Sequence, residues 1–226
     1  MPPKPRLFAP VEALVVATML LTIVSGTLAA SKYKVLHAFT GGNDGGGLYS
    51  GLLLDQEGNV YGETVAGGPK GKGGTAFRLE HQANGKWAEA VLYNFCSEPE
   101  CRDGGGPMGG LIFDPEGGLY GTTEGGGGPY KYGTVFELTP GTNGWKETVL
   151  RRFSQQDYGS DPQSALAMDA AGNLYGTAPA SAFELTPGPH GWKETILHEF
   201  TGQNGDGFGA YAGVIKEGEG VSSTKQ

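Results

Sequence analysis

A short sequence word that recurs along the chain is the feature that most constrains its fold. Residues 35–39, Val-Leu-His-Ala-Phe, have counterparts at 91–95, 149–153 and 196–200, at intervals of about 50 residues. Repeats of this length are each one supersecondary unit, and neighbouring units bury their apolar faces against one another. We therefore expect an array of similar units rather than one continuous core.

Four more words lie between these markers and recur in the same order. In the first full unit they are residues 51–55, 59–64, 75–79 and 87–90. Each word is short, rich in β-branched and aromatic residues, and bounded by glycine, asparagine, aspartate or proline, which is typical of strands joined by turns. Phe77 and Leu79 alternate with Arg78, as on a strand with one buried side. Each unit is therefore predicted to hold four short strands.

Glycine and proline are abundant, with 42 and 14 of 226 residues, and their placement decides between disorder and a turn-rich fold. They fall between the repeated words. Glu57-Gly58-Asn59 and its counterparts at 116–118 and 171–173 are typical of tight hairpin turns. The composition therefore reflects strand punctuation rather than disorder.

Four antiparallel strands in about 50 residues is the content of one propeller blade. We predict an all-β fold of β-propeller-like tandem repeats of four-stranded antiparallel units. Three full units plus terminal fragments fall short of a closed ring, so we expect an incomplete ring in which the two fragments meet in one partial blade. The alternative is an open arc, completed by another chain or cut short from a longer one. The recurring aromatic residues are interpreted as packing between units rather than as a stacking platform for a ligand.

The predicted domain organisation follows the words. Residues 1–29 are a signal peptide, 31–216 are the repeat domain, and 217–226 are an irregular tail. Within the repeat domain the units are about 40–95, 96–153 and 154–200, with a partial unit at 201–216.

The signal peptide is predicted from a three-part pattern. Lys4 and Arg6 form a basic start, residues 13–24 are apolar, and small residues follow up to the expected cleavage after Ala29. An uncleaved anchor is the alternative, but the run is shorter than the roughly 20 residues that span a bilayer. We expect a secreted or extracytoplasmic protein, in the periplasm or at the cell surface, with no membrane span in the mature chain.

The charge balance excludes some partners. There are 16 basic and 24 acidic residues, for a net charge of −8, which argues against binding to nucleic acid or to an anionic membrane. The expected partner is an extracellular glycan or protein, and open blade edges also allow self-association. No cofactor is predicted.

The words Gly-Leu-Tyr-Gly-Thr-Thr (118–123) and Gly-Thr-Val-Phe-Glu-Leu-Thr-Pro (133–140), with the Val-Leu-x-x-Phe marker, resemble the tandem repeat of the choice-of-anchor GloVer-repeat proteins. The resemblance covers about residues 33–215. It implies an exported bacterial protein with propeller-like repeats. This family offers no defined reaction or catalytic residues, so the resemblance bears on fold and location more than on function.

Aspartates recur in the turn after each marker, at Asp44, Asp103, Asp161 and Asp206. One hypothesis is a set of calcium loops, which bind the ion through carboxylate and carbonyl oxygens. Each turn has few acidic side chains, whereas aspartate is favoured in turns through its own hydrogen bonds. We therefore predict turns and no metal site.

Two further sets of carboxylates repeat, at Asp55, Asp114 and Asp169 and at Glu89, Glu147 and Glu194. Paired carboxylates raise the alternative of a propeller enzyme that acts on polysaccharide, as a glycoside hydrolase or lyase. Catalysis needs two carboxyl groups in unlike environments, whereas these occur in near-identical words. We therefore predict a non-catalytic exported repeat protein that is an extracellular binding or scaffold module.

Residues that break the repeat are the better candidates for specific binding. The predicted binding loops lie between the second and third strands and contain Lys70, Lys72, Tyr130, Lys131 and Tyr132. Other residues that depart from the repeat are His81, Arg151, Arg152 and Tyr158.

Cys96 and Cys101 are the only cysteines and lie in one turn of the second unit. In an exported chain this pair predicts a local disulfide. A redox pair is the alternative, although the spacing is not Cys-x-x-Cys.

Overall fold

The computed structural model describes residues 33–69, 71, 73–129, 131–154, 160–217 and 220–222. The predicted signal peptide lies outside these residues. The chain divides into two units, Met1–Val35 and Leu36–Gln226. The described residues of the first unit, 33–35, contain no strand, and all of the sheets belong to the second unit.

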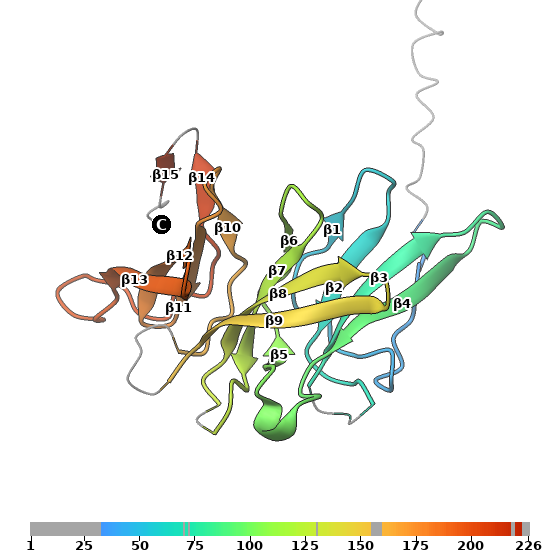
Figure 1. The fold of residues 1–226 in the computed structure, drawn as a ribbon, viewed down its shortest axis with the longest axis horizontal. Helices are drawn as coiled ribbons and strands as arrows, with labels where there is room; N and C mark the ends of the chain where they lie inside the picture. The colour runs from blue at the N-terminus through green and yellow to red at the C-terminus, as the bar shows by residue number, and fades with distance from the viewer. Residues whose placement is uncertain are drawn as a thin grey trace, which may run out of the picture. The chain divides into compact units, whose positions relative to one another are not determined.

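The fold is all-β, and each full repeat forms one antiparallel sheet (Figure 1). The strands of the first sheet are β1 (Leu53–Leu54), β2 (Val60–Thr64), β3 (Thr75–His81) and β4 (Trp87–Asn94). In the second sheet they are β5 (Gly105–Pro107), β6 (Ile112–Phe113), β7 (Leu119–Gly125), β8 (Thr134–Gly141) and β9 (Gly144–Arg152). In the third they are β10 (Ala167–Met168), β11 (Leu174–Ala178), β12 (Ser181–Gly188) and β13 (Gly191–Glu199). The predicted class, propeller-like repeats of four-stranded units, is confirmed.

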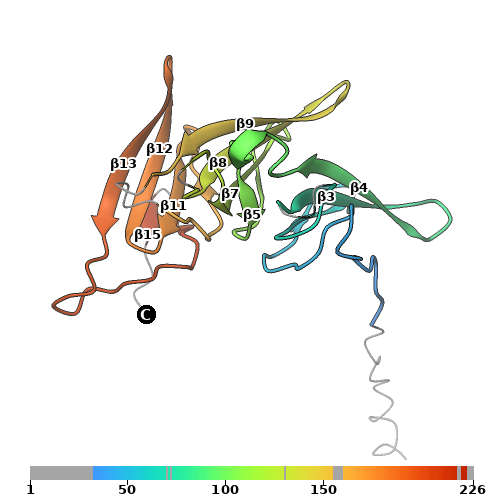
Figure 2. The same ribbon diagram turned by 90° about the horizontal axis from the view of Figure 1, so that it is seen from below.

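Two details differ from the word pattern. The fourth word and the marker that follows it form one continuous strand, so β4, β9 and β13 pair along the whole of β3, β8 and β12 in long twisted hairpins (Figure 2). The first strand is instead broken, because β5 and β6 pair with different parts of β7. In the first sheet the isolated bridge between Gly46 and Ala66 occupies the place of β5.

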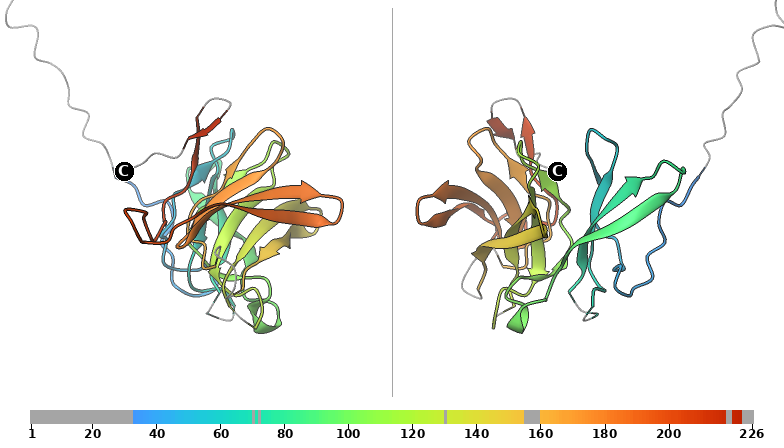
Figure 3. Two further views of the ribbon diagram at one scale, coloured as in Figure 1. Left: turned by 90° about the vertical axis from the view of Figure 1, so that its left-hand side faces the viewer. Right: turned by 45° about the vertical axis from the view of Figure 1, so that its right-hand side comes forward.

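The ends of the array are incomplete. Residues 33–39 form no strand, although the marker pattern predicts one, since a strand needs a neighbour with which to pair. After the third sheet, the described residues form one short hairpin, β14 (Ile215–Glu217) with β15 (Gly220–Ser222), which extends from the predicted partial unit into the expected irregular tail (Figure 3). Among the described residues no sheet combines the two ends, so the predicted shared partial blade is not formed there.

A phenylalanine and a glycine explain two positions of the repeated words. Phe77 on β3 lies opposite Gly62 on β2. A Cβ atom at Gly62 would stand 2.7 Å from the Phe77 ring, closer than van der Waals contact allows. Gly121 with Phe136 and Gly176 with Phe183 repeat this fit. The glycine that follows the tyrosine in the second word is therefore a packing requirement.

The same phenylalanine rings join one sheet to the next. Phe95, which follows β4, packs on Phe136 with ring centroids 4.9 Å apart. Phe153 and Phe183 make the equivalent contact at 5.5 Å. These four rings are almost completely buried, so the interpretation of the recurring phenylalanines as packing between units is confirmed.

One polar residue near the end of the second strand of each unit, at position 63, 122 or 177, contacts the segment that follows its own sheet. Thr122 donates its hydroxyl to the carbonyl of Ser164 at 3.1 Å, and Thr177 donates to the carbonyl of Ala212 at 2.8 Å. The first unit has Glu63 at this position, and its Oε2 accepts the Gly110 N–H at 2.9 Å. Glu63 is 1 % exposed, and its Oε1 has no hydrogen-bond partner among the described residues. Burial raises its pKa to about 8 from the ordinary 4.5, against the opposing effect of the Gly110 hydrogen bond.

Glu63 therefore predicts a specific dependence of stability on pH. Because the folded pKa is above the unfolded one, the folded protein binds the proton more tightly, and stability falls as pH rises from about 4.5 to about 8. Glu63→Gln removes the titrating proton and keeps an acceptor for Gly110. We expect the variant to match the wild type near pH 4.5 and to exceed it at pH 9 by a few kcal/mol, since each pKa unit corresponds to about 1.4 kcal/mol.

Chemical denaturation at several pH values measures this effect. Glu57→Gln, at an exposed turn residue, is the matched control and should leave the pH profile unchanged. Parallel profiles for the wild type and Glu63→Gln would show that Glu63 titrates normally in the folded protein.

Candidate functional site

The aspartates that follow the first strand of each unit stabilise hairpin turns. Asp55 accepts both the backbone and the side-chain N–H of Asn59, each at 2.8 Å. Asp169 is bound in the same way by Asn173, at 2.9 and 2.8 Å. Burial works to raise the pKa of both carboxyls, but the asparagine hydrogen bonds outweigh it and lower the pKa. These two carboxylates are therefore turn residues.

Asp114 differs because glycine replaces the asparagine of the other two turns. Its Oδ1 accepts the backbone N–H groups of Glu116 and Gly118 at 2.7 and 2.8 Å. Gly118 has no side-chain amide to donate to Oδ2. Of the three repeated turn carboxylates, Asp114 thus has the greatest capacity to accept a hydrogen bond from a ligand.

Two grooves flank the turn that contains Asp114. The first has a volume of about 490 Å³, and its lining residues are Leu54, Asp55, Gln56, Glu57, Phe113, Asp114, Pro115 and Gly117. The second has a volume of about 260 Å³, and its lining residues are Asp114, Pro115, Glu116, Tyr120, Met168, Gly172, Pro187 and Trp192. The two grooves occupy equivalent places in successive repeats. One wall of each groove is the hairpin turn of one sheet, and the other wall includes the end of the first strand of the next sheet.

The chemistry of the grooves combines carboxylates with aromatic and apolar surface. Phe113 lines the first groove, and Tyr120 and Trp192 line the second. Burial, followed by the charges of Glu137 and Asp114, raises the pKa of Tyr120, so its hydroxyl stays protonated. Neither set of lining residues contains a lysine, arginine or histidine. The grooves therefore suit a neutral or cationic ligand rather than an anionic one.

The predicted binding loops are only partly described. Lys70, Lys72 and Tyr130 lie outside the described residues, as does Tyr158. Lys131 is exposed, with a positive φ of 59°. Tyr132 is partly buried against the apolar cluster between the second and third sheets, so it contributes to packing.

The other repeat-breaking residues lie in several places. Arg151 forms an ion pair with Glu194 at 2.7 Å, and Arg152 donates its Nε–H to the carbonyl of Arg102 at 3.1 Å. His81 packs edge-on against Trp87. These contacts do not bring the three residues to one site.

Two of the aspartates in the predicted turns, Asp44 and Asp206, accept hydrogen bonds from their own loops. Asp44 accepts the N–H and the hydroxyl of Thr40 at 2.8 and 2.5 Å. Asp206 accepts the same two groups of Thr201 at 2.8 and 3.1 Å. Asp161 donates its backbone N–H to the carbonyl of Tyr132 at 2.8 Å. Within the described ranges, no group of three or more histidine, cysteine or acidic residues could hold a metal ion.

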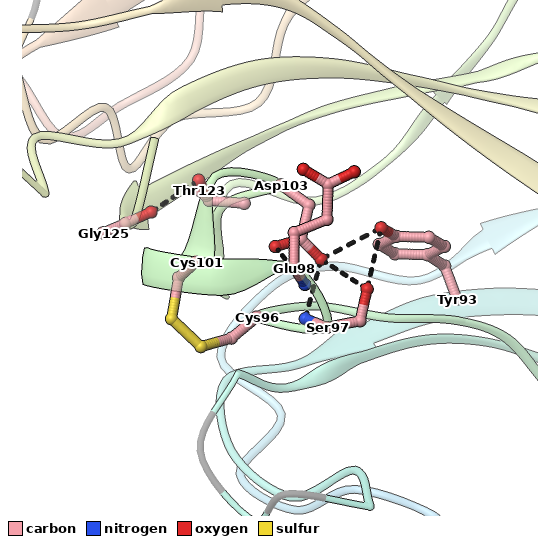
Figure 4. The surroundings of a disulfide bond; sticks show 8 residues. All are labelled: Tyr93, Cys96, Ser97, Glu98, Cys101, Asp103, Thr123 and Gly125. Atoms are coloured by element: carbon pink, nitrogen blue, oxygen red, sulfur yellow. Dashed lines mark hydrogen bonds between the residues drawn. A yellow bond between two sulfur atoms is a disulfide. The ribbon is translucent and has the colours of Figure 1, made fainter. Parts of the chain in front are cut away.

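Asp103 is the most extensively bound of these aspartates (Figure 4). It accepts the Tyr93 hydroxyl at 2.9 Å and the N–H and hydroxyl of Ser97 at 2.8 and 2.7 Å. The N–H of Glu98 donates to its other oxygen at 3.2 Å. The predicted disulfide between Cys96 and Cys101 is present and closes this loop. It holds together the short segment, including the 3₁₀ turn η1 (Pro99–Cys101), that presents these donors to Asp103.

The repeated glutamates have unlike environments, contrary to what their near-identical words suggest. Glu194 pairs with Arg151, whereas burial and the charges of Asp103 and Glu98 raise the pKa of Glu147 to about 8. Glu147, Glu98 and Tyr93 line a third cavity of about 500 Å³ at the β8–β9 hairpin. Sequence reasoning missed this cavity. The sequence does contain one indication of it: Tyr93 occupies the marker position at which the other units have a basic or titratable residue, His37, Arg151 or His198.

The disulfide predicts an effect on stability. Replacing both cysteines, Cys96→Ser with Cys101→Ser, should lower the free energy of unfolding by about 2 kcal/mol, because the unfolded chain regains loop entropy. Denaturant unfolding of the variant and the wild type measures the difference. The unreduced wild type should titrate no free thiol before unfolding, and two titrating thiols would contradict the bond.

The comparisons with known proteins agree with the repeat. A search of curated proteins finds no match. No helix in the described part of the chain is long and apolar enough to cross a membrane. Residues 21–223 match the Gloeobacter/Verrucomicrobia repeat. Because this match covers most of the sequence, the chain belongs to the Gloeobacter/Verrucomicrobia repeat family.

Proposed function

We propose that this protein is a non-catalytic, exported binding module whose ligand is a neutral or amino-group-bearing extracellular glycan. The observation that carries the proposal is the pair of repeat-equivalent grooves on either side of the Asp114 turn. The exposed ends of the array support a further part of it, self-association of copies: Leu52 is 54 % exposed, while its counterparts Leu111 and Leu166 are 6 % and 3 % exposed.

The lining residues suit a carbohydrate for two reasons. Aromatic side chains such as Trp192 and Phe113 offer flat apolar surface to the C–H face of a sugar ring, while few polar groups fix its orientation. Asp114 and Glu116 are hydrogen-bond acceptors for sugar hydroxyl or ammonium groups. The same carboxylates disfavour sulfated or uronic-acid polymers by like-charge repulsion.

Export is supported by two observations. The amino-terminal sequence has the basic, apolar and small-residue order of a signal peptide. The Cys96–Cys101 disulfide is typical of proteins that fold in an oxidising compartment.

Export predicts a processed amino terminus. Expression of the full chain in a bacterium with an active secretion pathway should give a product that begins at Ala30 and lies outside the cytoplasm. Intact mass and amino-terminal sequencing of the purified product measure this. Replacement of Leu20 and Leu21 by arginine should interrupt the apolar run and retain the product in the cytoplasm, whereas an unprocessed cytoplasmic wild type would contradict export.

Ligand binding is tested with a glycan array run beside a polysaccharide hydrolysis panel. We expect selective binding of neutral or amino glycans without turnover. Trp192→Phe and Asp114→Asn should each weaken binding about tenfold, since a smaller stacking surface or a lost charged hydrogen bond corresponds to about 1–2 kcal/mol. The reason is that both side chains line the second groove.

The repeat supplies the control for this experiment. Trp87→Phe changes the equivalent tryptophan of the first sheet, which lines neither groove, and should leave binding unchanged. Equal losses in Trp87→Phe and Trp192→Phe would indicate a general packing effect. Turnover that disappears in Asp114→Asn would instead establish the alternative, an enzyme that acts on polysaccharide.

A further inference from the structure

The cavity at the β8–β9 hairpin lies apart from the grooves of the proposed glycan site and has different chemistry. Its lining residues are Tyr93, Glu98, Gly141, Thr142, Asn143, Gly144, Trp145, Lys146 and Glu147. Two aromatic residues, two acidic residues and one lysine, Lys146, thus line a volume of about 500 Å³. Carboxylates beside aromatic rings are the surroundings in which proteins bind ammonium and guanidinium groups.

Glu147 is a partly buried residue of this cavity, and one of its carboxylate oxygens has no partner among the described residues. Its Oε1 is inaccessible to solvent and has no hydrogen-bond partner within the part of the chain that the structure describes. Oε1 of Glu194 is in the same state, so the two glutamates differ in the charged groups around them rather than in this atom.

The charged neighbours of Glu147 are Asp103 and Glu98, which disfavour its ionised form, and Arg152, whose opposing effect is weaker. Arg152 is itself engaged, because its Nε–H donates to the carbonyl of Arg102. A cation that enters the cavity would favour the ionised form of this carboxyl group, which burial and the two acidic neighbours disfavour.

The next repeat shows how the chain fills the equivalent place. Glu194 is the counterpart of Glu147, and the guanidinium of Arg151 pairs with it at 2.7 Å. The same guanidinium lies 5.7 Å from the ring centroid of Phe153. Arg151 is in turn the counterpart of Tyr93 in the marker word. Between the second and third sheets, Arg151 of β9 therefore supplies a cation to Glu194, whereas between the first and second sheets Tyr93 of β4 stands at this position beside an open cavity.

We propose that the cavity lined by Tyr93, Trp145, Glu98 and Glu147 binds a guanidinium or ammonium group from another molecule, such as an arginine or lysine side chain of a peptide. The bound cation takes the place that Arg151 occupies beside Glu194. It donates to Glu147 and lies against the aromatic rings. Tyr93 remains oriented for this contact because its hydroxyl donates to Asp103 at 2.9 Å.

The experiment uses a pair of probes that differ only in charge. N-acetyl-arginine amide is titrated into the isotopically labelled full chain, or into its processed form where export removes the leader, and amide chemical shifts are recorded. N-acetyl-citrulline amide, which has the same shape without the charge, is the reference. We expect saturable shifts at Asn143 and Gly144 with the arginine probe and at least tenfold weaker binding of the citrulline probe.

Two variants test the assignment of the cavity. Glu147→Gln should weaken binding of the arginine probe at least tenfold. Tyr93→Arg supplies the cation from within the chain, as Arg151 does for Glu194, and should abolish probe binding while the thermal unfolding midpoint is kept or raised. This second variant keeps the test decisive if Glu147→Gln folds poorly.

Glu194→Gln is the matched control, because it changes the equivalent glutamate of the third sheet and should leave binding of the arginine probe unchanged. Three results would overturn the proposal: equal binding of the two probes, unchanged binding in Tyr93→Arg, or no saturable shift with the arginine probe. Loss of glycan binding at the Asp114 turn has no bearing on it, since the two sites share no lining residue.

Discussion

The contact between phenylalanine rings of neighbouring sheets is the interaction on which the rest of the structure depends. A sheet of four short strands cannot bury both faces by itself, so each unit gains its core from the next. Phe136 serves two purposes: its ring fills the space above Gly121 in its own sheet and packs on Phe95 of the preceding one. The glycine and the phenylalanine must therefore repeat together, which explains why these words change least among the units.

Because the packing residues repeat from unit to unit, the sequence predicts the contacts that they make. The strands, the hairpin turns and the apolar contacts arise from residues within one word or from the same words in adjacent units, so they are visible as a pattern. Glu63 shows where the pattern stops being sufficient. The sequence shows a glutamate in place of the threonines of the other units, but its effect depends on Gly110 in the next sheet and on complete burial. Neither can be read from the word itself.

The candidate sites follow the same rule. Asp114 could have been distinguished from Asp55 and Asp169 by sequence alone, because Gly118 replaces an asparagine that binds the other two carboxylates. The environment of Glu147 could not, since it depends on Tyr93 and on a disulfide-closed loop from the other side of the interface. The similar sequence around the repeated glutamates predicts one structural role for all of them. Their protonation, however, depends on partners from the segments that vary most among the units.

The two sites share a physical origin. When a repeated acidic residue keeps an internal partner of opposite charge, as Glu194 keeps Arg151, its charge is balanced within the chain. When the partner is lost and the position stays buried or walled by neighbours, as with Glu147, the desolvation penalty remains without its compensation. A ligand that supplies the missing charge or hydrogen-bond donor then compensates the desolvation penalty of the carboxylate, and this gain favours binding. In an array of near-identical units, the places where an internal partner is missing are therefore where we expect a ligand to bind, and Glu147 is the one that we propose here.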